Sequence, residues 1–170
     1  MKLGYVNLPG RGETDQFLAA LAERLLSRGT RLAGTIQTNS ERNCTHHCDM
    51  DLRVLPDGPV VRINQDLGPE ATGCRLDAGA LEEAVLAVSV RLDEAELLIV
   101  NKFGRHEAEG RGFRHLMADA LALGLPVIVG VNMQNMSAFM AYAGDMAQLL
   151  PADPDRVLNW LSSANDVAAQ

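Results

Sequence analysis

The sequence of 170 residues contains no apolar run that approaches the roughly 18 residues of a membrane-spanning helix. Its first residues show no apolar signal region followed by a small-residue cleavage site, so we expect a cytoplasmic protein. Basic residues are scarce, since 15 Lys and Arg stand against 22 Asp and Glu, for a formal net charge of −7. This balance argues against a general attraction to nucleic acid or to anionic membranes. The three cysteines, an odd number, do not indicate a disulfide scaffold.

The composition and the order of short elements predict one α/β domain over residues 1–170. Hydrophobic residues make up 47% and charged residues 22% of the chain, as in an ordinary globular protein. Apolar segments with the length of buried strands alternate with amphipathic, helix-like segments, which is typical of a three-layer parallel sheet with helices on both faces. The expected strands cover residues 3–8, 31–37, 95–101 and 125–132, and the expected helices cover residues 14–28, 77–92, 116–123 and parts of 136–165.

The segment DLRVLPDGPVVRIN, residues 51–64, interrupts this alternation. Two alternating runs flank Pro56-Asp57-Gly58, a strong turn signal, so the segment predicts an antiparallel β-hairpin inserted at an edge of the sheet. Ligands of parallel sheets bind outside the carboxyl ends of the strands. We therefore expect the loops at residues 9–13, 102–112 and 133–137 to converge on one crevice.

The segment NLPGRGET, residues 7–14, has the position of a phosphate-binding loop but not its full pattern. In the pattern G-x-x-x-x-G-K-[ST], Asn7 replaces the first glycine and Glu13 replaces the lysine, whereas Thr14 keeps the hydroxyl that contacts Mg²⁺. Either the loop wraps an anion with its backbone N–H groups, or it is a plain turn in which Glu13 stabilises the helix dipole by roughly 0.3–1 kcal/mol. In the first case the binding residues are Gly10, Arg11, Gly12, Glu13 and Thr14.

The second loop, NKFGRHEAEGRG at residues 101–112, carries the positive charges that the first loop lacks. Lys102 or Arg105 can supply the missing cation, so that a phosphate or another oxyanion is held between the two loops. The alternative is that Glu13 forms an ion pair with one of these cations or with Arg111, and no ligand is bound. The glycines on either side of Arg111 allow a ligand or another chain to approach closely, which leaves a homodimer open. The binding candidates of this loop are Asn101, Gly104, Arg105 and Arg111, and the catalytic candidates are Lys102 and Glu107.

The stretch LLIVNKFGRHEAEGRGFRHLMADALALGLPVIVGV resembles the small nucleoside-triphosphatase family first described from thermophiles. That family has an Asp-Glu pair at the strand end, then a glycine, an acidic residue, a Phe-Arg step in a helix and a Pro-Val strand. The acidic pair is replaced here by Asn101-Lys102. The corresponding residues are Gly104, Glu107, Phe113-Arg114 and Pro126-Val127.

A bacterial family related to these enzymes is more similar still. Its members share the motifs NKFG or NRFG, EAEGRG and GCRLD, and they are often encoded near molybdate-transport genes. All three motifs are present, at residues 101–104, 107–112 and 73–77. The resemblance covers most of residues 3–132 and implies a P-loop fold. It does not imply hydrolysis, because Glu13 and Asn101-Lys102 depart from the pattern at the positions that hydrolysis uses.

A cluster of soft metal ligands follows the second expected strand. Cys44, His46, His47 and Cys48 lie close together in one loop, and the hairpin can bring Cys74 back to them. Such ligands suit Zn²⁺ or another soft metal, and two thiols can also bind molybdate, form a redox disulfide or simply pack. The alternative is a polar loop with incidental cysteines. In the related family the cysteines that match Cys48 and Cys74 recur, so the resemblance favours this pair over Cys44.

Three functions are compatible with these observations. The first is a nucleotide-, phosphate- or oxyanion-binding protein with a degenerate P-loop and Mg²⁺ beside a nucleotide, in a regulatory or accessory role that the resemblance links to molybdenum metabolism. The second is a nucleoside triphosphatase, at most a weak one, in which Lys102 or Arg105 replaces the loop lysine. The third is a protein that handles a soft metal or molybdate through Cys48 and Cys74.

Overall fold

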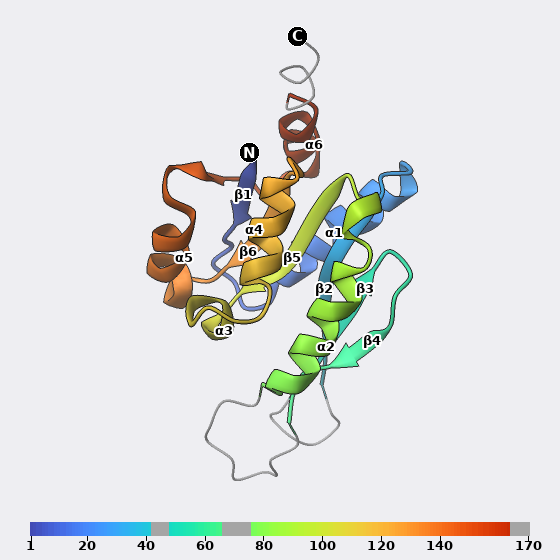
Figure 1. The fold of residues 1–170 in the computed structure, drawn as a ribbon, viewed down its shortest axis with the longest axis vertical. Helices are drawn as coiled ribbons and strands as arrows, with labels where there is room; N and C mark the ends of the chain where they lie inside the picture. Colours follow the sequence, from blue (N-terminus) through green and yellow to red (C-terminus); the bar gives the residue numbers. More distant parts are fainter. Residues whose placement is uncertain (42–47, 66–75, 164–170) are drawn as a thin grey trace.

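A computed structural model describes residues 1–41, 48–65 and 76–163 of the chain (Figure 1). In this part of the chain, seven strands form one sheet in the order β4-β3-β2-β5-β6-β1-β7. The strands are β1 Leu3–Val6, β2 Leu32–Glu41, β3 Cys48–Leu55, β4 Val60–Arg62, β5 Leu97–Phe103, β6 Val127–Val131 and β7 Ala147–Leu149. The helices are α1 Glu13–Ser27, α2 Ala78–Ser89, α3 Arg105–Ala108, α4 Arg114–Ala122, α5 Met136–Ala143 and α6 Pro154–Ser162. A search of these residues finds no helix long and apolar enough to cross a membrane.

The centre of the sheet is parallel, as the sequence predicts. Strand β5 pairs in parallel with β2 and β6, and β1 pairs in parallel with β6 and β7. The side chains of β6 are all buried, and those of β5 are buried except Lys102. A strand covered on both faces needs such a continuous apolar run, which is why the two segments were recognisable from the sequence.

The hairpin lies at one edge of the sheet, also as predicted. Strands β3 and β4 pair antiparallel, and β3 joins the sheet by pairing antiparallel with β2. The whole sheet is therefore mixed, with a parallel centre and an antiparallel edge. Strand β2 is longer than expected, because its polar end has no strand pattern of its own and is extended by pairing with β3 as far as Glu41.

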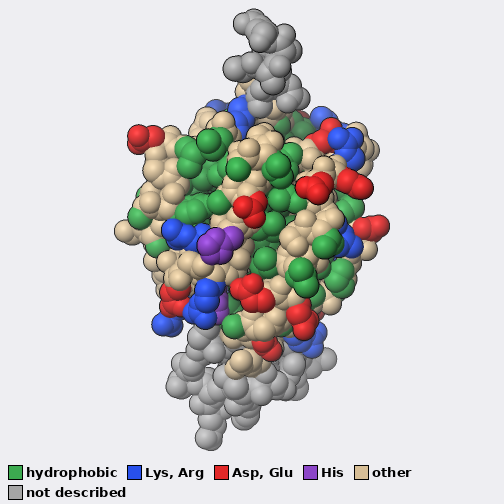
Figure 2. Space-filling model, viewed as in Figure 1, with side chains coloured by type: hydrophobic (Ala, Val, Ile, Leu, Met, Phe, Trp, Pro, Cys, Tyr) green, Lys and Arg blue, Asp and Glu red, His purple; other side chains and the backbone are tan. Residues whose placement is uncertain are grey.

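Helices cover both faces of the sheet, which confirms the three-layer prediction. Helices α2, α4 and α5 contribute Leu81, Met117 and Phe139 to the core of one face, and in Figure 1 α2 and α4 lie in front of the sheet. Helices α1 and α6 pack against the other face, around Leu18 and Val157. Figure 2 shows the outer surface of the first face, where hydrophobic side chains lie between scattered charged ones.

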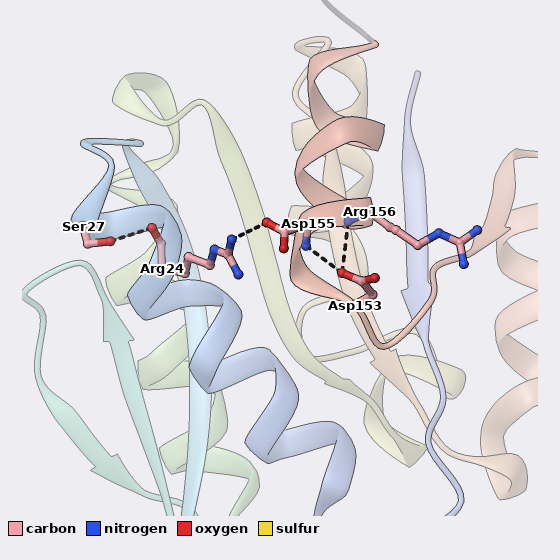
Figure 3. Close-up of polar contacts among 5 residues, drawn as sticks. All are labelled: Arg24, Ser27, Asp153, Asp155 and Arg156. Carbon is pink, nitrogen blue, oxygen red and sulfur yellow. Dashed lines mark hydrogen bonds and ion pairs between the residues drawn. The ribbon is translucent and has the colours of Figure 1, made fainter.

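The C-terminal helix α6 is held against α1 by polar contacts at its first turn (Figure 3). The Oδ1 atom of Asp153 accepts hydrogen bonds from the backbone N–H groups of Asp155 and Arg156, at 2.9 and 3.3 Å. The carboxylate of Asp155 forms an ion pair with Arg24 of α1. An acidic N-cap followed by a proline is a strong helix start, which is why α6 begins at Pro154.

Two elements differ from the expectation. Strand β7 lies inside the segment that was expected to hold only helices, because it pairs with the free edge of β1 although AQL has no clear strand pattern. Strand β5 extends to Phe103, so Asn101 and Lys102 belong to the strand and the second loop begins only at Gly104, followed by the single turn α3.

Candidate functional site

The loops after β1, β5 and β6 converge at the carboxyl edge of the sheet, because these three strands are neighbours. A cavity of about 320 Å³ lies between them, and we call it the glycine-loop cavity. The predicted crevice is therefore present, but Asn101 and Lys102 of β5 line it in place of the loop that follows β5. Its lining residues are Asn7, Leu8, Pro9, Gly10, Arg11, Gly12, Thr14, Asp15, Asn101, Lys102, Gly130, Val131, Asn132 and Met133.

We call residues 7–12, which join β1 to α1, the glycine loop. Backbone N–H groups at the end of this loop and the start of α1 face the cavity without a hydrogen-bond partner among the described residues. Gly12 has a φ of 76°, a conformation that glycine adopts without strain, and α1 starts after it without a side-chain cap. In the described part of the chain, the backbone N–H groups of Arg11, Gly12 and Thr14 donate to no other group. Free N–H groups at the positive end of a helix dipole attract an anion. The loop thus retains the backbone features of an anion site although its lysine is missing.

Glu13 occupies the lysine position and turns back on its own loop. Its carboxylate accepts a hydrogen bond from the N–H group of Gly10 at 3.1 Å and stays exposed to solvent. The expected ion pair with Lys102, Arg105 or Arg111 is not formed among the residues that the structure describes. The Gly10 N–H group belongs to the backbone, so this contact orders only the Glu13 side chain, whereas an ion pair across the cavity would also order a long cationic side chain. The Glu13 carboxylate therefore occupies the Gly10 N–H group, one of the backbone donors of this loop.

Asn101 lies near the end of β5, at the first of the two positions where the resemblance leads one to expect an acidic pair. Its side chain is buried, its Oδ1 accepts from the N–H group of Gln37 at 2.9 Å, and its Nδ2 donates to Asp15 Oδ1 at 2.9 Å. The amide therefore ties β5 to β2 and to α1. The amide carries no charge, so it does not supply the anionic oxygen that an acidic residue at this position would offer to a metal ion.

Positive charge reaches the glycine-loop cavity from two sides. Arg11 comes from the glycine loop and Lys102 from the end of β5, and both side chains are exposed. Within the described ranges, neither side chain forms a hydrogen bond or an ion pair. Asn132 adds a neutral donor, because its Oδ1 accepts from both the backbone and the side-chain nitrogen of Asn135, at 3.0 and 2.9 Å, and its own amide nitrogen stays available. These groups suit a phosphate or another oxyanion.

A divalent cation beside a bound phosphate has two potential ligands in this cavity. The Thr14 hydroxyl accepts from the N–H group of Leu8 at 3.0 Å and keeps a second lone pair. Asp15 supplies the one carboxylate among the residues that line the cavity. Oxygen ligands of this kind fit Mg²⁺. Sequence analysis missed Asp15 and Asn132, although Asp15 directly follows Thr14 and Asn132 is the last residue of a predicted strand.

The remaining candidates of the second loop do not reach the glycine-loop cavity. Glu107 is buried, and its carboxylate accepts from the N–H groups of Gly104 and Phe113, at 2.8 and 3.0 Å. Arg105 and Arg111 both bind Glu109, and the hydrogen bonds from these guanidinium groups hold the pKa of Glu109 below its ordinary value. Gly104, Arg105 and Glu107 line a neighbouring cavity, and Arg111 lines neither cavity. A catalytic role for Glu107 stays a prediction.

The predicted soft-metal site is mostly outside the described residues. Cys44, His46, His47 and Cys74 all lie there, and Cys48 is the first residue of β3. The described residues contain no group of three or more His, Cys, Asp and Glu side chains that could hold a metal ion. A Zn²⁺ or molybdate site at Cys48 and Cys74 therefore stays a prediction.

Comparison with known proteins finds a curated relative and several solved structures of similar fold. Molybdenum import ATP-binding protein ModC 2 from Bradyrhizobium diazoefficiens is 32% identical over 149 residues, which are 87% of this chain but only 17% of that protein. THEP1 from the hyperthermophile Aquifex aeolicus has a TM-score of 0.64 and 17% identity over the full length of both chains. A human cancer-related nucleoside triphosphatase has a TM-score of 0.58 and 13% identity over 99% of this chain and 98% of the other.

The two structural likenesses confirm the predicted P-loop NTPase-like α/β fold and its relation to the thermophile protein. At these identities they show the fold and nothing more. The family is shown by the sequence itself, since residues 3–160 match a single family model. The chain belongs to the family described as protein of unknown function DUF2478.

Proposed function

We propose that the protein binds a phosphate-bearing anion, a nucleotide with Mg²⁺ in the first place, in the glycine-loop cavity. One observation carries the proposal: unused N–H groups at the start of α1 and the side chains of Arg11 and Lys102 meet at a single cavity. In a chain with a net charge of −7, such a local gathering of donors favours the binding of an anion at this point. The Thr14 hydroxyl and the Asp15 carboxylate are the groups that would hold Mg²⁺.

The relatives support a nucleotide over a simple oxyanion. The curated relative is by name an ATP-binding protein of molybdenum import, and one structural neighbour is by title a nucleoside triphosphatase. Because the chain spans only 17% of the curated relative, the activity of that whole protein does not pass to it directly. We propose a regulatory or accessory role in molybdenum metabolism, in which a nucleotide is bound and serves as a signal.

Hydrolysis of ATP or GTP is expected to be well below about 1 s⁻¹, the low end of the ordinary enzyme range. A loop lysine neutralises charge that develops on the phosphate, and Glu13 places a negative charge there instead. Lys102, at the position of the second acidic residue, cannot accept a proton from water while it is charged. Phosphate release from MgATP and MgGTP, followed over hours with purified protein, measures the rate. Turnover between roughly 1 and 10³ s⁻¹ would show that Lys102 restores a working triphosphatase.

The variant Glu13→Gln is expected to bind MgADP about three- to tenfold more tightly than the wild type. The amide keeps an acceptor for the Gly10 N–H group but removes a negative charge beside the phosphate, and an exposed charge at a few ångström contributes about 1 kcal/mol. Isothermal titration calorimetry at a fixed 0.1 M salt gives both dissociation constants.

The matched control is Glu83→Gln, which makes the same chemical change at an exposed position of α2, away from the cavity. Its dissociation constant for MgADP is expected to equal that of the wild type. Equal affinities for all three proteins would mean that residues 10–14 form only a structural turn.

A further inference from the structure

A second cavity, of about 300 Å³, adjoins the first one, and we call it the Thr35 cavity. It shares Asn101, Lys102 and Asn132 with the glycine-loop cavity and extends from them towards the β-hairpin and α2. Its volume is at the lower end of the range for small-molecule sites, so it suits a compact ring system. Apolar walls with a few polar groups are the usual composition of such sites.

The walls of the Thr35 cavity combine apolar side chains with uncharged polar groups of β2. Leu52 of β3, Leu81 of α2 and Phe113 before α4 supply the apolar surface. Thr35 and Gln37, both buried and both on β2, supply a hydroxyl and an amide. Charged side chains that line this cavity come from the second loop and the end of β5. The cavity therefore combines surface for a ring with neutral hydrogen-bonding groups.

The hydroxyl of Thr35 is an unsatisfied polar group. The side chain is 1% exposed, and its Oγ1 has no hydrogen-bond partner among the described residues. A buried polar group without a partner destabilises the folded protein, so such a group in a cavity wall points to a partner supplied from outside. Because the methyl and hydroxyl groups of threonine share one carbon atom, a rotation about χ1 can turn the hydroxyl towards a ligand.

We propose that the Thr35 cavity binds a small heterocyclic molecule of the nucleobase class, with its ring between Leu52, Leu81 and Phe113 and its polar edge at Thr35. A heterocyclic base has an apolar face and an edge of neutral donors and acceptors, which matches the two kinds of wall. The ligand is separate from the anion in the glycine-loop cavity. Two ligands then meet at Asn101, Lys102 and Asn132, so this chain responds to a base and to an anion at adjoining sites.

The test is binding of adenosine, guanosine, cytidine and uridine, each followed through the assigned methyl NMR signals of the protein. At least one nucleoside is expected to shift the signals of Leu52 and Leu81. The variant Thr35→Val, which keeps the shape and removes the hydroxyl, is expected to weaken this binding about tenfold, the contribution of one hydrogen bond. Its melting temperature is expected to equal or exceed that of the wild type, because an unpaired hydroxyl is lost.

The matched control is Thr38→Val on the same strand, at an exposed position outside the cavity, which is expected to bind the nucleoside like the wild type. The proposal is overturned if no nucleoside shifts the Leu52 and Leu81 signals, or if Thr35→Val binds as tightly as Thr38→Val. Inorganic tripolyphosphate, which has no base, tests the glycine-loop cavity separately. Tripolyphosphate binding without nucleoside binding overturns only this inference, and the reverse result overturns only the anion-binding proposal.

Discussion

The variant Gly34→Ala is expected to lose about 4 kcal/mol or more of folding free energy, the largest effect of any single change proposed for this protein. Gly34 lies in β2 between β3 and β5 and has a φ of 130°, which residues with a side chain rarely adopt. A Cβ atom at this position would overlap the carbonyl oxygen of Ile99 on β5. Because that oxygen belongs to the backbone of a central strand, it can move only if the pairing of β2 with β5 is disturbed.

Thermal unfolding followed by circular dichroism measures this effect. For a chain of this length, about 4 kcal/mol corresponds to a fall in melting temperature of roughly 8–16 °C. The control is Gly29→Ala, which also places alanine at a positive φ, 80°, but has no atom within 4 Å of the added Cβ. This control is expected to lose only about 1–2 kcal/mol, the cost of the left-handed conformation itself. If both variants unfold at the same temperature, the close approach of β2 and β5 is not what requires glycine.

The variant Glu107→Ala is expected to lose about 2–5 kcal/mol of folding free energy. The carboxylate of Glu107 is 3% exposed and accepts from the N–H groups of Gly104 and Phe113. It thereby joins the start of α3 to the start of α4 and fixes the loop between them. Its removal leaves two backbone donors with no protein acceptor, and each such group costs about 1–3 kcal/mol.

Urea unfolding of wild type, Glu107→Ala and Glu109→Ala separates this role from a catalytic one. Glu109 lies in the same loop, but its carboxylate is exposed and binds Arg105 and Arg111 at the surface, so its loss is expected to change the unfolding midpoint little. An unchanged unfolding midpoint in Glu107→Ala would contradict the structural role of this carboxylate.

Most of the fold could be predicted because its elements have strong local patterns. The segments of β5 and β6 are apolar without interruption, α1 and α2 have apolar residues at helical spacing, and Pro56-Asp57-Gly58 marks the hairpin turn. The missed parts have weak patterns. Strand β7 and the polar end of β2 become strands only because a neighbouring strand offers unpaired backbone groups.

The candidate site was predictable in position and less so in detail. A parallel sheet brings the loops after β1, β5 and β6 together whatever their side chains are, so the convergence of Gly12 and Lys102 could be expected. The direction of a side chain depends on which partner is nearest in space. Glu13 turns to Gly10 and Asn101 to Gln37 and Asp15, and no sequence spacing distinguishes these partners from the cations across the cavity.

By itself, the sequence determined the α/β class, the alternation of the central strands and helices, the hairpin turn and the loss of the phosphate-loop lysine at Glu13, because these depend on residues close along the chain. The tertiary structure alone decided that Asp15 and Asn132 line the glycine-loop cavity. It also decided that the Glu107 carboxylate accepts hydrogen bonds from two backbone N–H groups. Finally, it placed Thr35 in a cavity wall, where its hydroxyl has no hydrogen-bond partner among the described residues. These contacts join residues of different elements. Such burial and hydrogen bonding depend on how the helices pack against the sheet, and the local pattern of apolar and polar residues in the sequence does not specify that packing.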